Sequence, residues 1–136
     1  MGVVIEGRYL GRKKIRLVHE PSGAELLTDA PRDNYGEASS FSPTDLVAGA
    51  LGACMMTIIG ILAEREGLDV SGMHMRVEKH MQPEPRRIAR LELVLHLPAA
   101  LSAEDRRRLE SAARSCPVSR CLHPDIAVEH RFLYDV

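Results

Sequence analysis

The sequence predicts an α+β fold in which a largely antiparallel sheet packs around one long, buried central helix. Residues 42–67 form an apolar stretch with no charge between Asp45 and Glu64, which is typical of a helix covered on all sides. Residues 88–97 alternate between leucines and mostly polar side chains, as a half-buried strand does. Residues 102–115 have the apolar spacing of an amphipathic helix. Strands before, between and after two helices indicate the α+β class.

The N-terminal segment predicts three strands followed by a loop. The strands are expected over residues 2–10, 13–19 and 24–28, and the loop over residues 29–41. The first two strands meet at a turn formed by Gly11 and Arg12. Ile15 and Leu17 alternate with charged side chains, so this hairpin is expected to have one covered face and one solvent-exposed face.

The central helix has clear start and stop signals. Ser42 is a good cap, Pro43 suits the first helical position, Asp45 suits the positive end of the helix dipole, and Gly67 ends the helix. The length also reaches the lower limit for a membrane span. However, its glycines, its moderate hydrophobicity and its mixed flanking charges argue against a membrane helix.

Covering this helix on all sides requires a second chain. One sheet face covers only one side, and the second helix is too polar to cover the rest. We therefore expect an obligate homodimer, in which central helices pack on each other or on the partner's sheet. Four small residues would let two backbones approach closely: Ala48, Gly49, Gly52 and Ala53.

The C-terminal half predicts two further strands, the second helix and a last strand. The expected bounds are a strand over residues 68–81, a turn at Pro83 and Pro85, a strand over residues 88–97, a helix over residues 102–115, a short turn over residues 117–122 and a strand over residues 126–134. Ser102, with Asp105 three residues later, resembles a capping box at the start of the second helix.

Composition excludes several classes of function. The chain has 136 residues, 18 basic and 19 acidic, and fits a single domain over residues 1–136. It has no basic stripe with interleaved aromatics, so no nucleic-acid partner is expected. Glu6 and Arg8 interrupt any signal-peptide core, and a cytoplasmic location is expected. Three cysteines are too few for a secreted disulfide framework.

Two cysteines have settings that suit thiol chemistry. Cys54 lies near the middle of the apolar helix, and Cys116 lies where the second helix ends, facing the core. Because burial disfavours a thiolate, a reactive Cys54 needs a cation, most economically an arginine held by a carboxylate. Such a pocket suits an organic hydroperoxide, with a sulfenic acid on Cys54 resolved by Cys116. The plain alternative is a core helix with an incidental buried cysteine.

The motif SPTDL at residues 42–46, GAC at residues 52–54 and CPVSRC at residues 116–121 together resemble the OsmC/Ohr family, in its SPTDL-type branch. The resemblance extends over almost the whole chain. It implies an OsmC-like α+β fold, an intertwined homodimer, and two active sites built from both chains. It also implies a thiol peroxidase in which Cys54 attacks the hydroperoxide and Cys116 resolves the resulting sulfenic acid on Cys54. Reduction by a dithiol, typically a dihydrolipoyl group, would complete the cycle.

The sequence departs from the family pattern at the carboxylate that fixes the catalytic arginine. Thr44 stands where the family often has glutamate, and Asp45 follows it, rotated by about 100° around the helix. Asp45 is the predicted replacement, with a helix-dipole role and Glu37 as alternatives. For the arginine, Arg32 in the preceding loop is the first choice. The alternatives in the N-terminal hairpin are Arg12, Arg8 and Arg16.

The third cysteine and the histidines could in principle bind a metal, but they are expected to have only structural roles. Cys121 is expected to be a spectator rather than a second resolving thiol. A zinc site formed by the three cysteines and His123 lacks the usual spacing, so neither a metal nor a cofactor is expected. The strand histidines are read as ordinary strand residues: His74, His80, His96 and His130. The alternative function is a non-catalytic OsmC-like dimer that binds an apolar or thiol-bearing small molecule.

Overall fold

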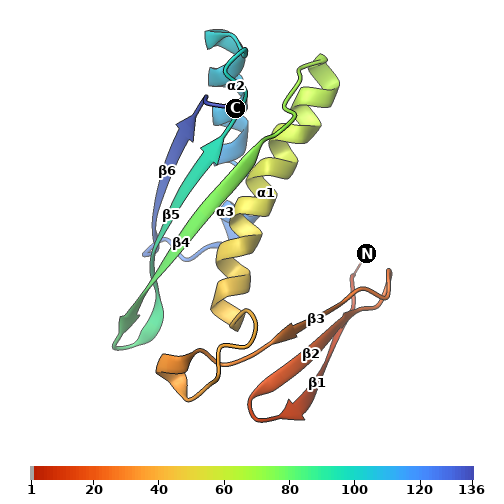
Figure 1. Ribbon diagram of the computed structural model, residues 1–136, viewed down its shortest axis with the longest axis vertical. Coiled ribbons are helices and arrows are strands. Elements are labelled where there is room, and N and C mark those ends of the chain that lie inside the picture. Colours follow the sequence, from red (N-terminus) through yellow and green to blue (C-terminus); the bar gives the residue numbers. More distant parts are fainter. Residues whose placement is uncertain (1) are drawn as a thin grey trace. The chain divides into compact units, whose positions relative to one another are not determined.

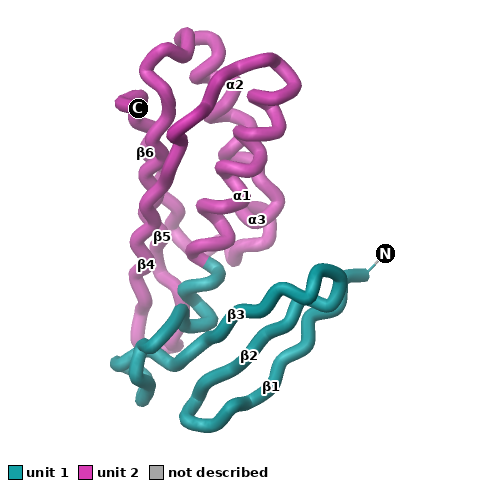
Figure 2. Tube along the Cα trace, turned by 45° about the vertical axis from the view of Figure 1, so that its right-hand side comes forward, with its two compact units in different colours: residues 1–47 teal, residues 48–136 magenta. Residues whose placement is uncertain are grey.

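The computed structural model describes residues 2–136 and confirms the α+β class. The chain forms two compact units, residues 1–47 and residues 48–136 (Figure 2). Each unit has a three-stranded sheet of its own, where the sequence predicts one largely antiparallel sheet. The assignment of the whole chain to a single domain stays a prediction.

The first unit is a β-meander with one mainly apolar face. Strands β1 (Ile5–Gly11), β2 (Lys14–His19) and β3 (Glu25–Thr28) are antiparallel in the order β1-β2-β3. The strand register places these apolar residues on one face: Ile5, Tyr9, Ile15, Leu17 and Leu26. Ile5, Tyr9 and Leu26 remain exposed, so this face is apolar, as expected, but is not fully covered within one chain.

The helix α1 (Pro43–Glu66) buries one stripe and leaves another open. The buried stripe consists of Ala48, Leu51, Gly52, Met55, Ile59 and Ala63. Gly52 packs closely on Met75, because a Cβ atom at this position would lie 2.4 Å from the Met75 methyl carbon and would force that side chain to move. Two of the four small residues predicted to face a second helix, Ala48 and Gly52, are thus used within the chain. By length and composition alone α1 could also cross a membrane, a test that core helices of soluble proteins pass as well.

The second unit places a sheet beside the helices. Strands β4 (His74–Pro83), β5 (Arg86–His96) and β6 (Ala127–Leu133) lie in the order β4-β5-β6. β4 and β5 are antiparallel, whereas β5 and β6 are parallel. The parallel pair arises because the chain crosses through α2 (Ala103–Arg114) and α3 (Pro117–Cys121) before returning to the sheet.

The predicted alternation in β5 determines which face is the core. Leu91, Leu93, Leu95 and Leu97 are buried among residues of α1 and α2. Figure 1 shows the helices on one side of this sheet. The opposite, open face carries mostly charged side chains of alternate residues. At the start of α2, the Ser102 hydroxyl accepts from the Asp105 N–H at 3.1 Å, so the predicted cap is confirmed.

The strand expected from residue 68 begins only at His74. Before it, the Asp69 carboxylate accepts hydrogen bonds from the backbone N–H and the hydroxyl of Ser71, at 2.9 and 2.6 Å. Gly72 then adopts a φ of 82°. This local turn gives backbone polar groups hydrogen-bond partners without a neighbouring strand. The alternation of apolar and polar residues in the sequence does not distinguish such a turn from a strand.

Replacing Leu93 with alanine is expected to lower the free energy of unfolding by about 2–5 kcal/mol, because it removes a fully buried side chain and leaves a cavity. Val94→Ala, on the open face of the same strand, is the control and should cost less than half as much. Urea unfolding at fixed protein concentration measures both. Equal losses would show that the open face is as tightly packed as the core.

Candidate active site

Two of the three cysteines lie at the centre of the helical side of the second unit. Cys54 projects from the middle of α1, half-buried between the buried stripe and the open side of the helix. Cys116 is fully buried in the core formed by the β5 leucines. Neither cysteine forms a disulfide in the structure.

The sequence around Cys116 explains its position. Cys116 is the N-cap of α3, and its Sγ accepts a hydrogen bond from the Ser119 N–H at 3.4 Å. Pro117 at the first helical position starts the new helix and ends the previous one. The turn between α2 and α3 therefore turns the Cys116 side chain inward. Cys121, at the end of α3, is exposed.

Cys54 packs against the core cluster that contains Cys116. Burial raises the pKa of Cys116, the nearby Cys54 side chain raises it further, and the Ser119 N–H lowers it. The raised pKa favours the protonated thiol form of Cys116. A half-buried thiol that packs beside a buried one is compatible with disulfide formation once one of the two sulfurs is oxidised.

Asp45 forms hydrogen bonds in the cap at the start of α1. Its Oδ2 accepts from the Ser42 N–H at 2.8 Å, and the Ser42 hydroxyl accepts from the Asp45 N–H at 3.1 Å. This reciprocal pair is a capping box, so the helix-start role considered for Asp45 is present. Thr44 places its hydroxyl 3.3 Å from that of Ser42.

Among the candidate arginines, Arg12 is held by a carboxylate in the first unit. Its guanidinium hydrogen-bonds the Glu37 carboxylate, which Lys14 also approaches at 3.3 Å. Arg32 lies in the exposed 3₁₀ turn η1 (Arg32–Asn34) and makes no ion pair within residues 2–136. Arg16 pairs with Glu25 of the neighbouring strand at 3.3 Å.

The turn that carries Arg12 has a strained backbone. Arg12 and Lys13 both have positive φ, 55° and 64°, in a position where Asn-Gly would be the favoured sequence. The Tyr9 hydroxyl accepts from the Lys13 N–H at 3.1 Å and supports the turn. Residues held in this left-handed region without glycine are concentrated at functional sites.

A buried carboxylate, Asp29, organises the loop behind this turn. It accepts from the Ser39 hydroxyl at 2.6 Å and from the Ser39 N–H at 3.0 Å, which together with Lys14 lower the pKa of Asp29 to about 2. Lys14 therefore lies between two carboxylates, Asp29 and Glu37. No local signal in the sequence marks Asp29 and Lys14, because their contacts join positions far apart in the chain.

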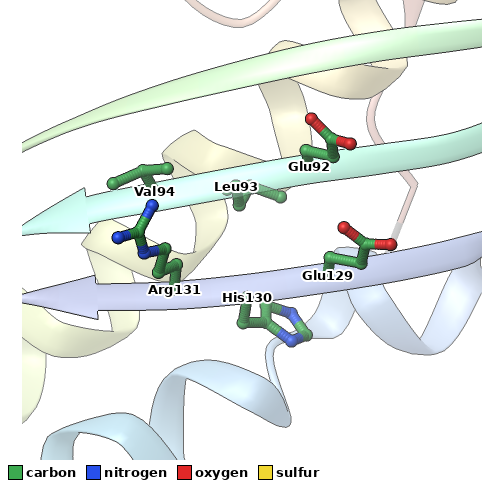
Figure 3. Close-up of a pocket in the computed structure, with 6 residues that line it drawn as sticks. All are labelled: Glu92, Leu93, Val94, Glu129, His130 and Arg131. Atoms are coloured by element: carbon green, nitrogen blue, oxygen red, sulfur yellow. The ribbon is translucent and has the colours of Figure 1, made fainter.

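A separate shallow hollow of about 320 Å³ lies on the second sheet. Its lining residues are Glu92, Leu93, Val94, Glu129, His130 and Arg131. Figure 3 shows Glu92 and Glu129 projecting from one face of β5 and β6, whereas His130 points to the other. No cysteine lines this hollow, so it is distinct from the paired thiols.

Known proteins share both the sequence pattern and the fold. The family model for OsmC-like protein matches residues 36–131. A crystal structure from Psychrobacter arcticus 273-4, of a protein named for osmotic stress induction and a detoxification response, is 34% identical, covers 97% of each chain and has a TM-score of 0.92. No curated protein matches the sequence.

Two more distant crystal structures share the fold. One is the organic hydroperoxide resistance protein OsmC of Legionella pneumophila, 20% identical over 98% of this chain and 97% of that chain, with a TM-score of 0.74. The other is an organic hydroperoxide resistance protein of Vibrio cholerae with captopril bound in one of its active sites. It is 20% identical over 100% of this chain and 93% of that chain, with a TM-score of 0.75.

The family model covers well over half of the sequence, and the Psychrobacter protein matches nearly the whole chain. The chain therefore belongs to the family of OsmC-like proteins.

Proposed function

We propose that this protein is a thiol-dependent peroxidase that reduces organic hydroperoxides. The observation that carries the proposal is that the half-buried Cys54 packs against the core that contains the buried Cys116. The names of the Legionella and Vibrio proteins, both organic hydroperoxide resistance proteins, support a peroxide-related role.

The proposed cycle has three steps. The Cys54 thiolate attacks the outer oxygen of the hydroperoxide, the O–O bond breaks, and the alkoxide leaves and takes a proton to become an alcohol. The Cys116 sulfur then attacks the Cys54 sulfenic acid, forming a disulfide and releasing water. A dithiol reductant, such as a dihydrolipoyl group, returns both cysteines to thiols and is itself oxidised to a disulfide.

For the activating cation we propose Arg12, held by Glu37. The sequence-based choice, Arg32, has no carboxylate partner in the described chain, whereas Arg12 has one and sits on a strained turn. An arginine fixed by a carboxylate presents its remaining N–H donors in a set direction, which suits both a thiolate and a peroxide oxygen.

We further propose that the active unit is a homodimer. The open stripe of α1 consists of Val47, Ala50, Ala53, Thr57 and Ile61. Ile61 is 48% exposed in the single chain, and the Thr57 hydroxyl is satisfied by the Ala53 carbonyl at 2.8 Å, which leaves its methyl group outward. Together with the uncovered face of the first sheet, this is a large apolar surface for a monomer.

The peroxidase proposal predicts that the reduced protein consumes cumene hydroperoxide when it is supplied with dihydrolipoamide. Cys54→Ser should lower kcat/KM by at least about 10³-fold, because the nucleophile is lost. Cys116→Ser should react once per chain and then stop, because the sulfenic acid has no resolving thiol. Cys121→Ser is the control and should turn over normally.

A spectrophotometric assay of hydroperoxide loss, with mass spectrometry of the Cys54 peptide, distinguishes these outcomes. Absence of turnover in the wild type with several dithiols would reject the peroxidase. Ligand binding would then be tested with thiol-bearing molecules, which the captopril complex of the Vibrio protein favours.

The arginine proposal predicts that Arg12→Ala lowers kcat/KM by about 10- to 100-fold, since a charged hydrogen bond contributes about 1.5–3 kcal/mol. Arg12→Lys should retain part of the rate, and Arg32→Ala should stay within about twofold of wild type. The pH profile of Cys54 alkylation should move to higher pH in Arg12→Ala only. The reverse pattern would identify Arg32 as the activating residue.

The dimer proposal predicts that Ile61→Glu shifts the protein from dimer toward monomer, because a charge would be buried in an apolar interface. Analytical ultracentrifugation should find twice the mass of one chain for the wild type. Glu104→Lys, which changes an exposed charge on α2, is the control and should remain dimeric. A monomeric wild type would contradict the proposal.

A further inference from the structure

Three glutamates lie side by side across the open face of the second sheet. The strand register pairs Glu78 of β4 directly with Glu92 of β5, and Glu92 directly with Glu129 of β6. Like charges directly opposite one another on neighbouring strands destabilise a sheet. This row of carboxylates therefore needs cations between its members.

Arg90 supplies the cation on one side of the row. Its guanidinium hydrogen-bonds Oε1 of Glu92 and lies 3.6 Å from Oε2 of Glu129. Between Glu78 and Glu92, the group in the corresponding place is the His80 ring. Its Nε2 lies 3.3 Å from Oε2 of Glu78 and 3.6 Å from Oε2 of Glu92.

The environment of His80 Nε2 differs from that of an ordinary surface histidine. The atom is shielded from solvent, and it has no hydrogen-bond partner in the part of the chain that the structure describes. A shielded nitrogen between two carboxylate oxygens is poorly satisfied as a neutral acceptor. A cation shared by all three groups would satisfy the nitrogen and both oxygens at once.

We propose that Glu78, His80 and Glu92 form a binding site for one first-row divalent metal ion. Their donor atoms all lie within 4.8 Å of one another. Donors that share a metal at about 2.0–2.2 Å can be at most about 4.4 Å apart, so small rotamer changes complete the site. One imidazole and two carboxylates suit Zn²⁺, Co²⁺ or Mn²⁺, whereas the thiols suit softer ions.

The site is separate from the paired cysteines and does not depend on the proposed peroxidase. Glu78 and Glu92 lie on the open face of the sheet, whereas Cys54 and Cys116 belong to the core on the helical face. Glu92 belongs both to the proposed site and to the lining of the hollow on the second sheet, where Figure 3 shows it beside Glu129. A metal here would link β4 to β5 across their shared register.

The test is a titration of the reduced, full-length protein with Co²⁺, followed by visible absorption and by amide NMR. We expect saturable binding of one ion per chain, with paramagnetic broadening greatest around Glu78, His80 and Glu92. His80→Gln and Glu78→Gln should each weaken binding by at least about tenfold. Because Glu78 is exposed, its replacement should leave the fold intact.

His74→Gln is the matched control, because it removes an imidazole from the same face of the same strand without touching the site. It should keep the wild-type affinity, and Zn²⁺ should raise the Tm of wild type and His74→Gln but not of His80→Gln. Absence of saturable binding would overturn the proposal. So would binding that survives both site variants, or an intense thiolate-to-cobalt absorption band that disappears in Cys54→Ser.

Discussion

The structure depends on one constraint, which is that a helix apolar on every side meets a sheet that covers only one side. The β5 leucines bury the stripe of α1 that contains Leu51, Met55 and Ile59. Burying such side chains contributes roughly 1.5–3 kcal/mol each and holds the second unit together. The same packing leaves the opposite stripe of α1 exposed, and it places Cys54 at the boundary between the two.

This boundary position gives Cys54 two properties that rarely occur together. The thiol packs against the core that contains the fully buried Cys116, yet it is itself only half-buried. Burial raises the pKa of Cys116, which favours the protonated form of that thiol. The proposed nucleophile and the proposed resolving thiol are both cysteines, but they differ in burial: Cys54 is half-buried and Cys116 is fully buried.

Charges are arranged differently in the two units. In the first, Asp29, Lys14, Glu37 and Arg12 form a chain of alternating charges that ends on a strained turn. In the second, three glutamates share one face, and His80 and Arg90 lie between them. The first network joins a strand residue to residues of a turn and a loop, and the second joins residues of three neighbouring strands, so the fold rather than local sequence determines which charges meet.

The sequence by itself determined the order of the main helices and strands, the helix caps and the family, but not the start of β4 or the division into two sheets. Hydrophobic periodicity, Pro and Gly signals and the Ser102 cap are local properties, and the two cysteine motifs are contiguous. Only the tertiary structure decided that β6 runs parallel to β5, that Gly52 packs on Met75, that Cys54 packs against the core around Cys116, and that Glu37 pairs with Arg12. These depend on contacts between residues distant in the chain, and local propensity carries no information about which distant residues will meet.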